Sequence, residues 1–303
     1  MQDIMSYYKS CTLCPRACGV NREEGEVGVC GAGALPRVAH TMLHMWEEPF
    51  LSGVRGSGTV FFSGCPLGCV YCQNARISRS YTGAEYNEKA LAELFLCLER
   101  QGAHNINLVT ATHFAPHVAA AISLARKAAL SLPIVYNTSG YESVKTLRLF
   151  EGKVDVYLTD VRYHAAKTAG KYSSALDYPA AAMTALAEMV RQTGEGQIDK
   201  DGMLRRGTVV RILLLPGHLI EAKQILREVF GRYGDSVYIS LMSQYTPIEG
   251  IGGEYPELSR RVTAYEYASL VDYARKLDIT RAFTQEGSAA SESFIPDFSS
   301  DLS

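Results

Sequence analysis

The sequence predicts an α/β protein built as a partial (β/α)6 TIM-like barrel with a cysteine-rich N-terminal extension. Three observations support this prediction: a length of 303 residues, strand-like and helical patterns that alternate along the chain, and seven cysteines gathered in two short clusters. A barrel of this kind takes roughly 200 to 250 residues, which leaves room for an extension. We expect a cysteine-rich segment at residues 1–55 and the barrel at residues 56–298.

The alternation begins with a strand-like run at 59–63 and a helical pattern at 88–101. Further strand-like runs lie at 105–111, 133–137, 154–160, 208–215, 236–243 and 280–284. Helical patterns lie between them at 116–131, 141–150, 179–193, 219–233 and 261–277. Strands that are nearly continuous in Val, Ile and Leu are typical of a parallel sheet covered by helices. We favour a partial barrel, although periodicity alone does not distinguish it from an open doubly wound sheet.

Composition and charge exclude several classes of function. Thirty Lys and Arg residues face 32 Asp and Glu residues, for a formal net charge of −2, and no basic block forms a surface for nucleic acid. The N-terminus has no basic start followed by an apolar run, as a secretory signal would. The most apolar stretch, 118–132, is interrupted by Arg126 and Lys127, so we expect no membrane span. The sequence thus predicts a cytoplasmic protein whose cysteines remain thiols.

Three cysteines, Cys65, Cys69 and Cys72, follow the first predicted strand on one short loop. In βα folds the chemistry gathers at the carboxyl ends of the strands, where this loop begins. A structural zinc site takes four protein ligands, so a compact trio indicates a centre with an open position. A [4Fe–4S] cluster held by three thiolates has such a position. The alternatives are a zinc knuckle with a distant fourth ligand and a redox-sensing trio.

The spacing of this trio, with Tyr71 directly before the last cysteine, resembles the signature of the radical SAM superfamily. The resemblance implies that Cys65, Cys69 and Cys72 hold a catalytic [4Fe–4S] cluster and that Tyr71 lies beside the adenine of S-adenosyl-L-methionine (SAM). It also implies reductive cleavage of SAM to a 5′-deoxyadenosyl radical that abstracts hydrogen. An electron donor such as flavodoxin or ferredoxin would supply the electron.

The end of the second predicted strand departs from that family. A Gly-Gly-Glu motif commonly binds the SAM ammonium there, whereas this chain has Thr110-Ala111-Thr112-His113. We expect the hydroxyls of Thr110 and Thr112, with backbone carbonyls, to accept the ammonium hydrogen bonds. His113 either faces the substrate as a proton donor or makes a local hydrogen bond.

The next strand ends, Tyr136-Asn137-Thr138-Ser139-Gly140-Tyr141 and Asp160-Val161-Arg162, resemble those of the pyruvate formate-lyase activating enzyme group. The resemblance implies that Arg162 binds the SAM carboxylate and that Asn137 and Asp160 lie near a monovalent cation. Arg211 lies in an apolar strand, so it needs an anion, either a ligand carboxylate or a structural partner. Two weaker candidates for substrate or methionine contacts follow the sixth strand, at Gln244 and Tyr245.

A second set of cysteines lies at the N-terminus, at Cys11, Cys14, Cys18 and Cys30. Four thiolates can close a zinc site or a second [4Fe–4S] cluster, and spacing does not decide between them. The opening Cys-x-Leu-Cys-Pro-Arg-x-Cys-Gly-Val-Asn-Arg resembles uncharacterised iron–sulfur proteins labelled pyruvate formate-lyase activating-like. The metal either folds a loop-rich arm or serves as an auxiliary cluster near the barrel mouth. The eighth cysteine, Cys97, is expected in the core.

Two functions remain open at this point. The first is a radical SAM oxidoreductase of unknown substrate, one example being activation of a glycyl-radical enzyme in trans by hydrogen abstraction from a glycine of that partner. The alternative is a non-catalytic iron–sulfur or zinc sensor or interaction protein on the same fold. The missing Gly-Gly-Glu motif and Asn137 favour the sensor, while the intact cysteine trio, Arg162 and Arg211 favour the enzyme.

Overall fold

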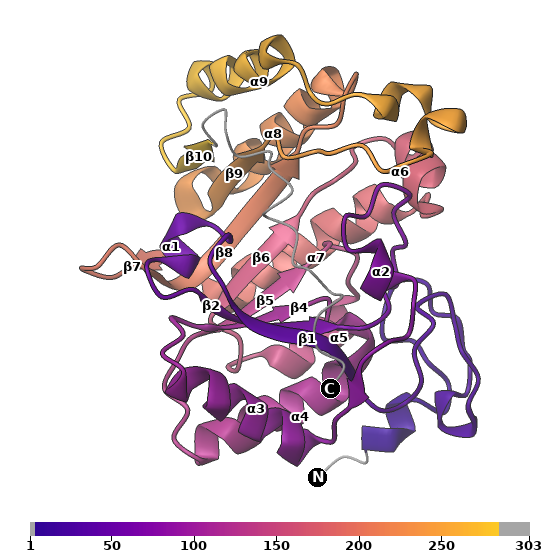
Figure 1. Ribbon diagram of the computed structural model, residues 1–303. Coiled ribbons are helices and arrows are strands. Elements are labelled where there is room, and N and C mark those ends of the chain that lie inside the picture. Colours follow the sequence, from indigo (N-terminus) through magenta and orange to yellow (C-terminus); the bar gives the residue numbers. More distant parts are fainter. Residues whose placement is uncertain (1–3, 285–303) are drawn as a thin grey trace.

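The computed structural model describes residues 4–284, and a curved β-sheet runs through it (Figure 1). Seven strands of the sheet are parallel, and they correspond to the seven predicted strands. They are β2 (Ser57–Phe62), β4 (Ile106–Val109), β5 (Ile134–Thr138), β6 (Val156–Asp160), β8 (Leu204–Leu213), β9 (Tyr238–Met242) and β10 (Ala282–Thr284). The sheet order β10-β9-β8-β6-β5-β4-β2-β1-β3 does not close on itself, so the predicted partial barrel is confirmed.

Long helices connect successive parallel strands. They are α3 (Glu88–Arg100), α4 (Ala115–Lys127), α7 (Tyr178–Thr193), α8 (Leu219–Tyr233) and α9 (Ala264–Lys276). In Figure 1, α3 and α4 lie side by side near one end of the sheet, and α8 and α9 pack together near the other. The buried faces of these helices and of the strands form the main core, as their apolar spacing predicts.

One edge of the sheet was not predicted. The segment 1–55 contains a strand, β1 (Arg37–His44), which pairs antiparallel with β2, and β3 (Ala84–Glu85), after the cysteine trio in sequence, pairs with β1. Most residues of β1 are half-buried on both faces, so the strand lacks the alternation that marks a strand in sequence. The division at residue 55 stays a prediction, and the end of the predicted barrel at residue 298 lies outside the described residues.

The remaining elements are short. The pattern at 141–150 gives one helical turn and a 3-10 helix, because the chain turns at Gly152 with a positive φ of 71°. The other strand is β7 (Gln197–Ile198), which pairs with β8. The short α-helices are α1 (Pro49–Ser52), α2 (Ala75–Ser78), α5 (Val144–Leu147) and α6 (Ala166–Ser173). The 3-10 helices are Ile4–Tyr7, Arg22–Glu24, Thr112–Phe114, Arg148–Phe150, Gly234–Ser236, Ile251–Gly253 and Pro256–Ser259.

Two further expectations concern the helices. Cys97 on α3 is half-buried rather than part of the core, because the buried face of that helix passes through Leu91, Phe95 and Leu98. Over residues 4–284, no helix combines the length and the apolarity that crossing a membrane would require.

Candidate functional site

A cavity of about 780 Å³ occupies the interior of the partial barrel. Cavities of roughly 300 to 1,000 Å³ are typical of small-molecule and cofactor sites. The carboxyl ends of the parallel strands contribute Asn137, Asp160, Arg162 and Arg211 to its lining. The sequence predicted these residues at separate strand ends, and the sheet brings them together.

The three cysteines of the loop 64–72, which we call the cluster loop, all line this cavity. Gly64 begins the loop with φ of 84°, and a side chain there would place its Cβ 2.5 Å from the carbonyl oxygen of Cys30. Burial raises the pKa of the Cys65 thiol to about 12 and also raises that of Cys72. Ionised thiols at this site therefore need compensation by positive charge, which bound iron supplies.

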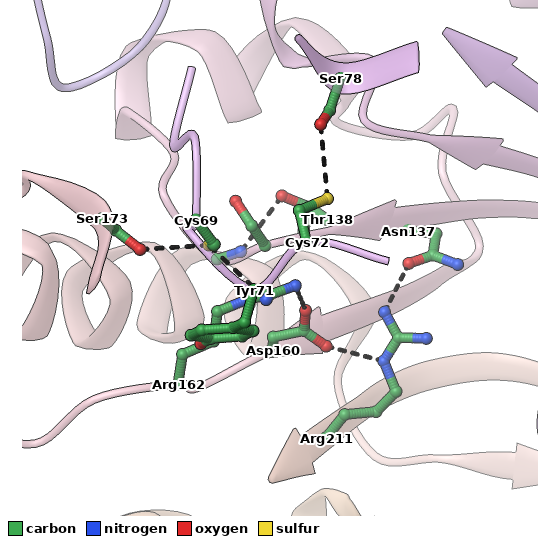
Figure 2. A network of polar contacts seen from close by, with 12 residues as sticks. Cys69, Tyr71, Cys72, Ser78, Asn137, Thr138, Asp160, Arg162, Ser173 and Arg211 are labelled. Atoms are coloured by element: carbon green, nitrogen blue, oxygen red, sulfur yellow. Dashed lines mark hydrogen bonds and ion pairs between the residues drawn. The ribbon is translucent and has the colours of Figure 1, made fainter. Parts of the chain in front are cut away.

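Hydrogen-bond donors surround two of the three sulfurs (Figure 2). Ser173 Oγ, at the end of α6, donates to Cys69 Sγ at 3.1 Å, and an Arg162 terminal nitrogen lies 3.7 Å from the same sulfur. Ser78 Oγ on α2 donates to Cys72 Sγ at 3.4 Å. Thiols on one loop, with donors directed at their sulfurs, are a ligand set that fits an iron–sulfur cluster.

An ion network lies next to the cluster loop in the cavity (Figure 2). Asp160 accepts hydrogen bonds from Arg162 and, at 2.8 Å, from Arg211 Nε. Arg211 also donates to Asn137 Oδ1 at 2.7 Å. Burial alone would raise the pKa of Asp160, but Arg211 and Arg162 together outweigh it and hold that pKa below its ordinary value. The anion that Arg211 needs is thus a structural partner, the carboxylate of Asp160.

Two carboxylates in the cavity were missed from the sequence. Glu47 accepts from Asn137 Nδ2 at 3.2 Å and lies 3.5 Å from a terminal nitrogen of Arg211. Glu48 accepts from Ser240 Oγ at 2.8 Å, and its burial raises its pKa. Both residues follow β1, which carried no strand signal, so nothing in the sequence directed this segment into the barrel.

Comparison with known proteins adds three findings. Residues 52–175 match a family model described as a 4Fe-4S single cluster domain. A solved radical SAM methyltransferase from Sphaerobacter thermophilus has a similar fold, with a TM-score of 0.50 and 14% sequence identity over 76% of this chain and 67% of that one. An uncharacterized protein of Methanocaldococcus jannaschii is 28% identical over 279 residues, 90% of this chain and 76% of its own length.

The family match indicates a 4Fe-4S cluster domain in residues 52–175, and the structural likeness shows a shared fold. The matched family segment contains the cluster loop. Resemblance to the pyruvate formate-lyase activating group is a finer statement that these comparisons leave untested.

Arg162, which lines the cavity, has one donor that is open to an acceptor from a ligand. Within residues 4–284, Arg162 Nε is buried without a hydrogen-bond acceptor. An unsatisfied guanidinium N–H is costly, and a carboxylate is the acceptor that it binds best. The predicted contact between Arg162 and the SAM carboxylate would give this donor an acceptor.

The two threonines predicted for the SAM ammonium lie in different environments. Thr110 lines the cavity and has φ of 60°, a strained conformation for a β-branched residue. Thr112 is absent from the cavity lining within the described chain, and its hydroxyl donates to the buried Glu142 at 2.5 Å. Thr138 Oγ1 donates to the same carboxylate oxygen at 2.5 Å. The hydroxyl of Thr112 therefore binds Glu142 and does not face the cavity in which the SAM ammonium was expected.

His113 also lies away from the cavity lining in the described part of the chain. Its Nε2 is 2.8 Å from the carbonyl oxygen of Ser63, and burial lowers its pKa to about 3. The neutral ring therefore donates from Nε2, which is the local hydrogen bond that the sequence left as one alternative. By contrast, Tyr71, Gln244 and Tyr245 line the cavity, and the Tyr71 hydroxyl lies 2.7 Å from that of Tyr163.

The N-terminal cysteines are not part of the described cavity lining, and Cys30 approaches the cluster loop through its carbonyl oxygen at Gly64. Cys11, Cys14 and Cys30 are buried, and Cys18 is exposed. Within residues 4–284, no three His, Cys, Asp or Glu side chains are grouped closely enough to hold a single metal ion, and this is true of the N-terminal cysteines and of Cys65, Cys69 and Cys72 alike. The buried guanidinium of Arg22 lies 3.7 Å from Cys11 Sγ, so this segment supplies a positive charge next to one of its thiols.

Proposed function

We propose that this protein is a radical SAM enzyme whose cluster loop holds a [4Fe–4S] cluster and whose cavity binds SAM. The observation that carries the proposal is that Cys65, Cys69 and Cys72 line one cavity together with Arg162. Cys65, Cys69 and Cys72 would hold the cluster, which when bound would supply the electron for reductive cleavage of SAM to a 5′-deoxyadenosyl radical that abstracts hydrogen from the substrate. The family match and the shared fold support this proposal.

The residues of the chain would bind and orient SAM. Arg162 is assigned to the SAM carboxylate, since its Nε is unpartnered. Asp160 binds Arg162 from one side and Arg211 from the other, which fixes the guanidinium of Arg162 in place. Because both oxygens of Asp160 contact arginines, we assign it to positioning rather than to a monovalent cation. Asn137 is likewise assigned to positioning, because its Oδ1 accepts a hydrogen bond from Arg211.

Two residues complete the proposed SAM site. Tyr71 is buried at the cavity wall, with edge contacts to Tyr163, Tyr172 and Tyr245, and we assign its ring to the adenine. Thr110 is assigned to the ammonium through its hydroxyl and carbonyl oxygens, because it lines the cavity at the end of β4.

The hydrogen donor is proposed to come from outside the chain. One such reaction is activation of a glycyl-radical enzyme, in which hydrogen leaves the Cα of a glycine in the partner protein. An electron donor such as flavodoxin or ferredoxin would reduce the cluster. The N-terminal quartet Cys11, Cys14, Cys18 and Cys30 is proposed to hold a second cluster or zinc, and the chain to divide into segments 1–55 and 56–298.

A second function has one observation in its favour. The charges of Asp160, Arg211 and Glu47 are paired with one another inside the cavity, so no ligand is needed to neutralise them. An iron–sulfur or zinc sensor on this fold would have the same arrangement. Arg162 favours the enzyme over the sensor, because within the described residues its buried Nε has no hydrogen-bond acceptor and the SAM carboxylate would provide one.

Equilibrium binding of SAM to the protein reconstituted with iron and sulfide tests the proposal. We expect Arg162→Ala to weaken binding about 10- to 100-fold, the equivalent of one charge-assisted hydrogen bond. Arg275→Ala, in an exposed ion pair on α9, is the matched control and should bind SAM as the wild type does. A wild-type protein that holds its cluster but does not bind SAM would instead support the sensor.

A further inference from the structure

Arg16 in the N-terminal segment contacts two other parts of the chain that meet at the cluster loop. Its Nε donates to the carbonyl of Pro66 at 3.1 Å, and a terminal nitrogen lies 3.3 Å from the carbonyl of Leu67. The same guanidinium donates at 2.8 Å to the carbonyl of Ser173, the last residue of α6, and also to that of Ser174. One side chain thus connects the N-terminal segment, the cluster loop and the C-terminal end of α6.

The position of Arg16 is fixed by its own surroundings. Its guanidinium carbon lies 5.4 Å from the ring centre of Tyr141, a cation–π contact, and the Tyr141 hydroxyl donates to Asp177 at 2.8 Å. Planar geometry with donors on several edges lets arginine bind several carbonyls at once, which lysine cannot do. In sequence, Arg16 stands midway between Cys14 and Cys18.

The end of α6 that Arg16 holds carries a donor to a cysteine of the cluster loop. Ser173 offers its carbonyl to Arg16, while its hydroxyl donates to Cys69 Sγ at 3.1 Å. The hydroxyl of Tyr163 lies 2.7 Å from Ser173 Oγ, and Val70 N–H donates to the carbonyl of Tyr172. The distance from Ser173 to Cys69 therefore depends on how α6 docks against the loop.

We propose that Arg16 is a positioning residue for Cys69: it holds α6 against the cluster loop so that the Ser173 hydroxyl donates to the Cys69 sulfur, which raises the reduction potential of the bound cluster. Hydrogen bonds to cysteine sulfurs stabilise the more negatively charged reduced cluster, and they are one of the known determinants of its potential. The inference rests on the proposed function, since it assumes a cluster at Cys69. It gives the N-terminal segment a role in the redox behaviour of the site.

The test is the midpoint potential of the reconstituted protein, measured for Arg16→Met, Arg16→Lys, Ser173→Ala and the double variant R16M/S173A. We expect R16M and S173A to shift the potential to more negative values and R16K to shift it less than R16M. If Arg16 acts through Ser173, the double variant shifts no further than S173A alone. The matched control is Arg206→Met, because Arg206 likewise binds two carbonyls at a helix end, that of α7, and should leave the potential unchanged.

A second measurement does not need the cluster. In the apoprotein Cys69 is buried, so we expect R16M to speed its alkylation while the half-buried Cys97 reacts at the wild-type rate. Unchanged potential and unchanged alkylation of Cys69 in R16M would overturn the inference, as would additive shifts in the double variant. Failure of the wild type to bind a cluster would refute the proposed function, and alkylation would then decide the positioning role by itself. If R16M does not fold, the potentials of R16K and S173A are compared with that of the wild type instead, and both are expected to be more negative.

Discussion

Asp160 on β6 and Arg211 on β8 are register partners in the parallel sheet, and Arg211 Nε donates to Asp160 Oδ1 at 2.8 Å inside the barrel. Arg162 contacts the other oxygen of Asp160. A charge in an apolar strand is tolerated only when it is paired, and here one carboxylate serves two guanidinium groups. The network therefore stabilises the barrel and orients Arg162 at the same time.

Removing the carboxylate of this network should destabilise the fold. Asp160→Asn would remove the carboxylate that binds Arg162 and would leave Arg211 with Glu47, 3.5 Å away, and we expect a loss of about 3 to 5 kcal/mol in the free energy of unfolding. Urea unfolding of the apoprotein measures this loss. Asp272→Asn, in an exposed ion pair with Arg275, is the control and should change stability by less than about 0.5 kcal/mol. Equal stabilities of the two variants would contradict the role of the network.

The buried Glu142 predicts a dependence of stability on pH. Burial raises its pKa from 4.5 to about 7, although Thr112 and Thr138 donate to it. The folded protein holds this proton at pH values where the unfolded chain has lost it. Its contribution is fully present below pH 4.5, is lost as the pH rises to about 7, and is constant above that.

Glu142→Gln should remove this dependence. Compared with the variant, the wild type should lose up to about 3 kcal/mol of unfolding free energy between pH 4.5 and 7. Urea unfolding of both apoproteins across this range gives the difference, in which other titrating groups cancel. A difference that does not vary with pH would show that the carboxyl is ionised when buried.

The first glycine of the cluster loop should not tolerate a side chain. Gly64 has φ of 84° and no room, with the carbonyl oxygen of Cys30 2.5 Å from a built Cβ. Gly68 in the same loop has φ of 68° and nothing within 4 Å. We therefore expect Gly68→Ala to cost about 1 to 2 kcal/mol from backbone strain alone and Gly64→Ala to cost clearly more. Thermal unfolding of the apoproteins tests the order, and a G68A variant as unstable as G64A would refute the steric argument.

The N-terminal cysteines should bind metal independently of the cluster loop. Cys14→Ala and Cys30→Ala are expected to lower the total iron or zinc content while the loop 64–72 retains its cluster. Metal analysis of reconstituted variants, with the absorption spectrum of the cluster, separates the two sites. Cys97→Ala is the control, since Cys97 lies on α3 and belongs to neither cysteine group. Metal content equal to the wild type in C14A and C30A would exclude a metal at these residues.

The parallel strands and the cysteine trio were predictable because their signals are local. Runs of Val, Ile and Leu mark buried strands, and the spacing of Cys65, Cys69 and Cys72 lies within one loop. We could expect the residues at the strand ends to share one cavity, because the carboxyl ends of parallel strands meet at one edge of the sheet. The sequence thus predicted the fold, the three cysteines of the cavity and the polar residues at its strand ends.

The remaining features depend on contacts between distant segments. Glu47 enters the barrel from a loop after β1, and its partners Asn137 and Arg211 are on other strands. Thr112 turns away from the cavity because Glu142, thirty residues later in the chain, takes its hydroxyl. No period or motif in a single sequence encodes such pairings.

The most direct test of the account is release of 5′-deoxyadenosine. The protein is reconstituted with iron and sulfide without oxygen, given SAM and dithionite, and the product is detected by mass spectrometry, with metal quantified on the same sample. We predict release by the wild type and none from Cys65→Ala, Cys69→Ala or Cys72→Ala, because each variant removes a thiolate from the cluster. Full release from any of these variants, or none from a wild type that carries its cluster and binds SAM, would contradict it.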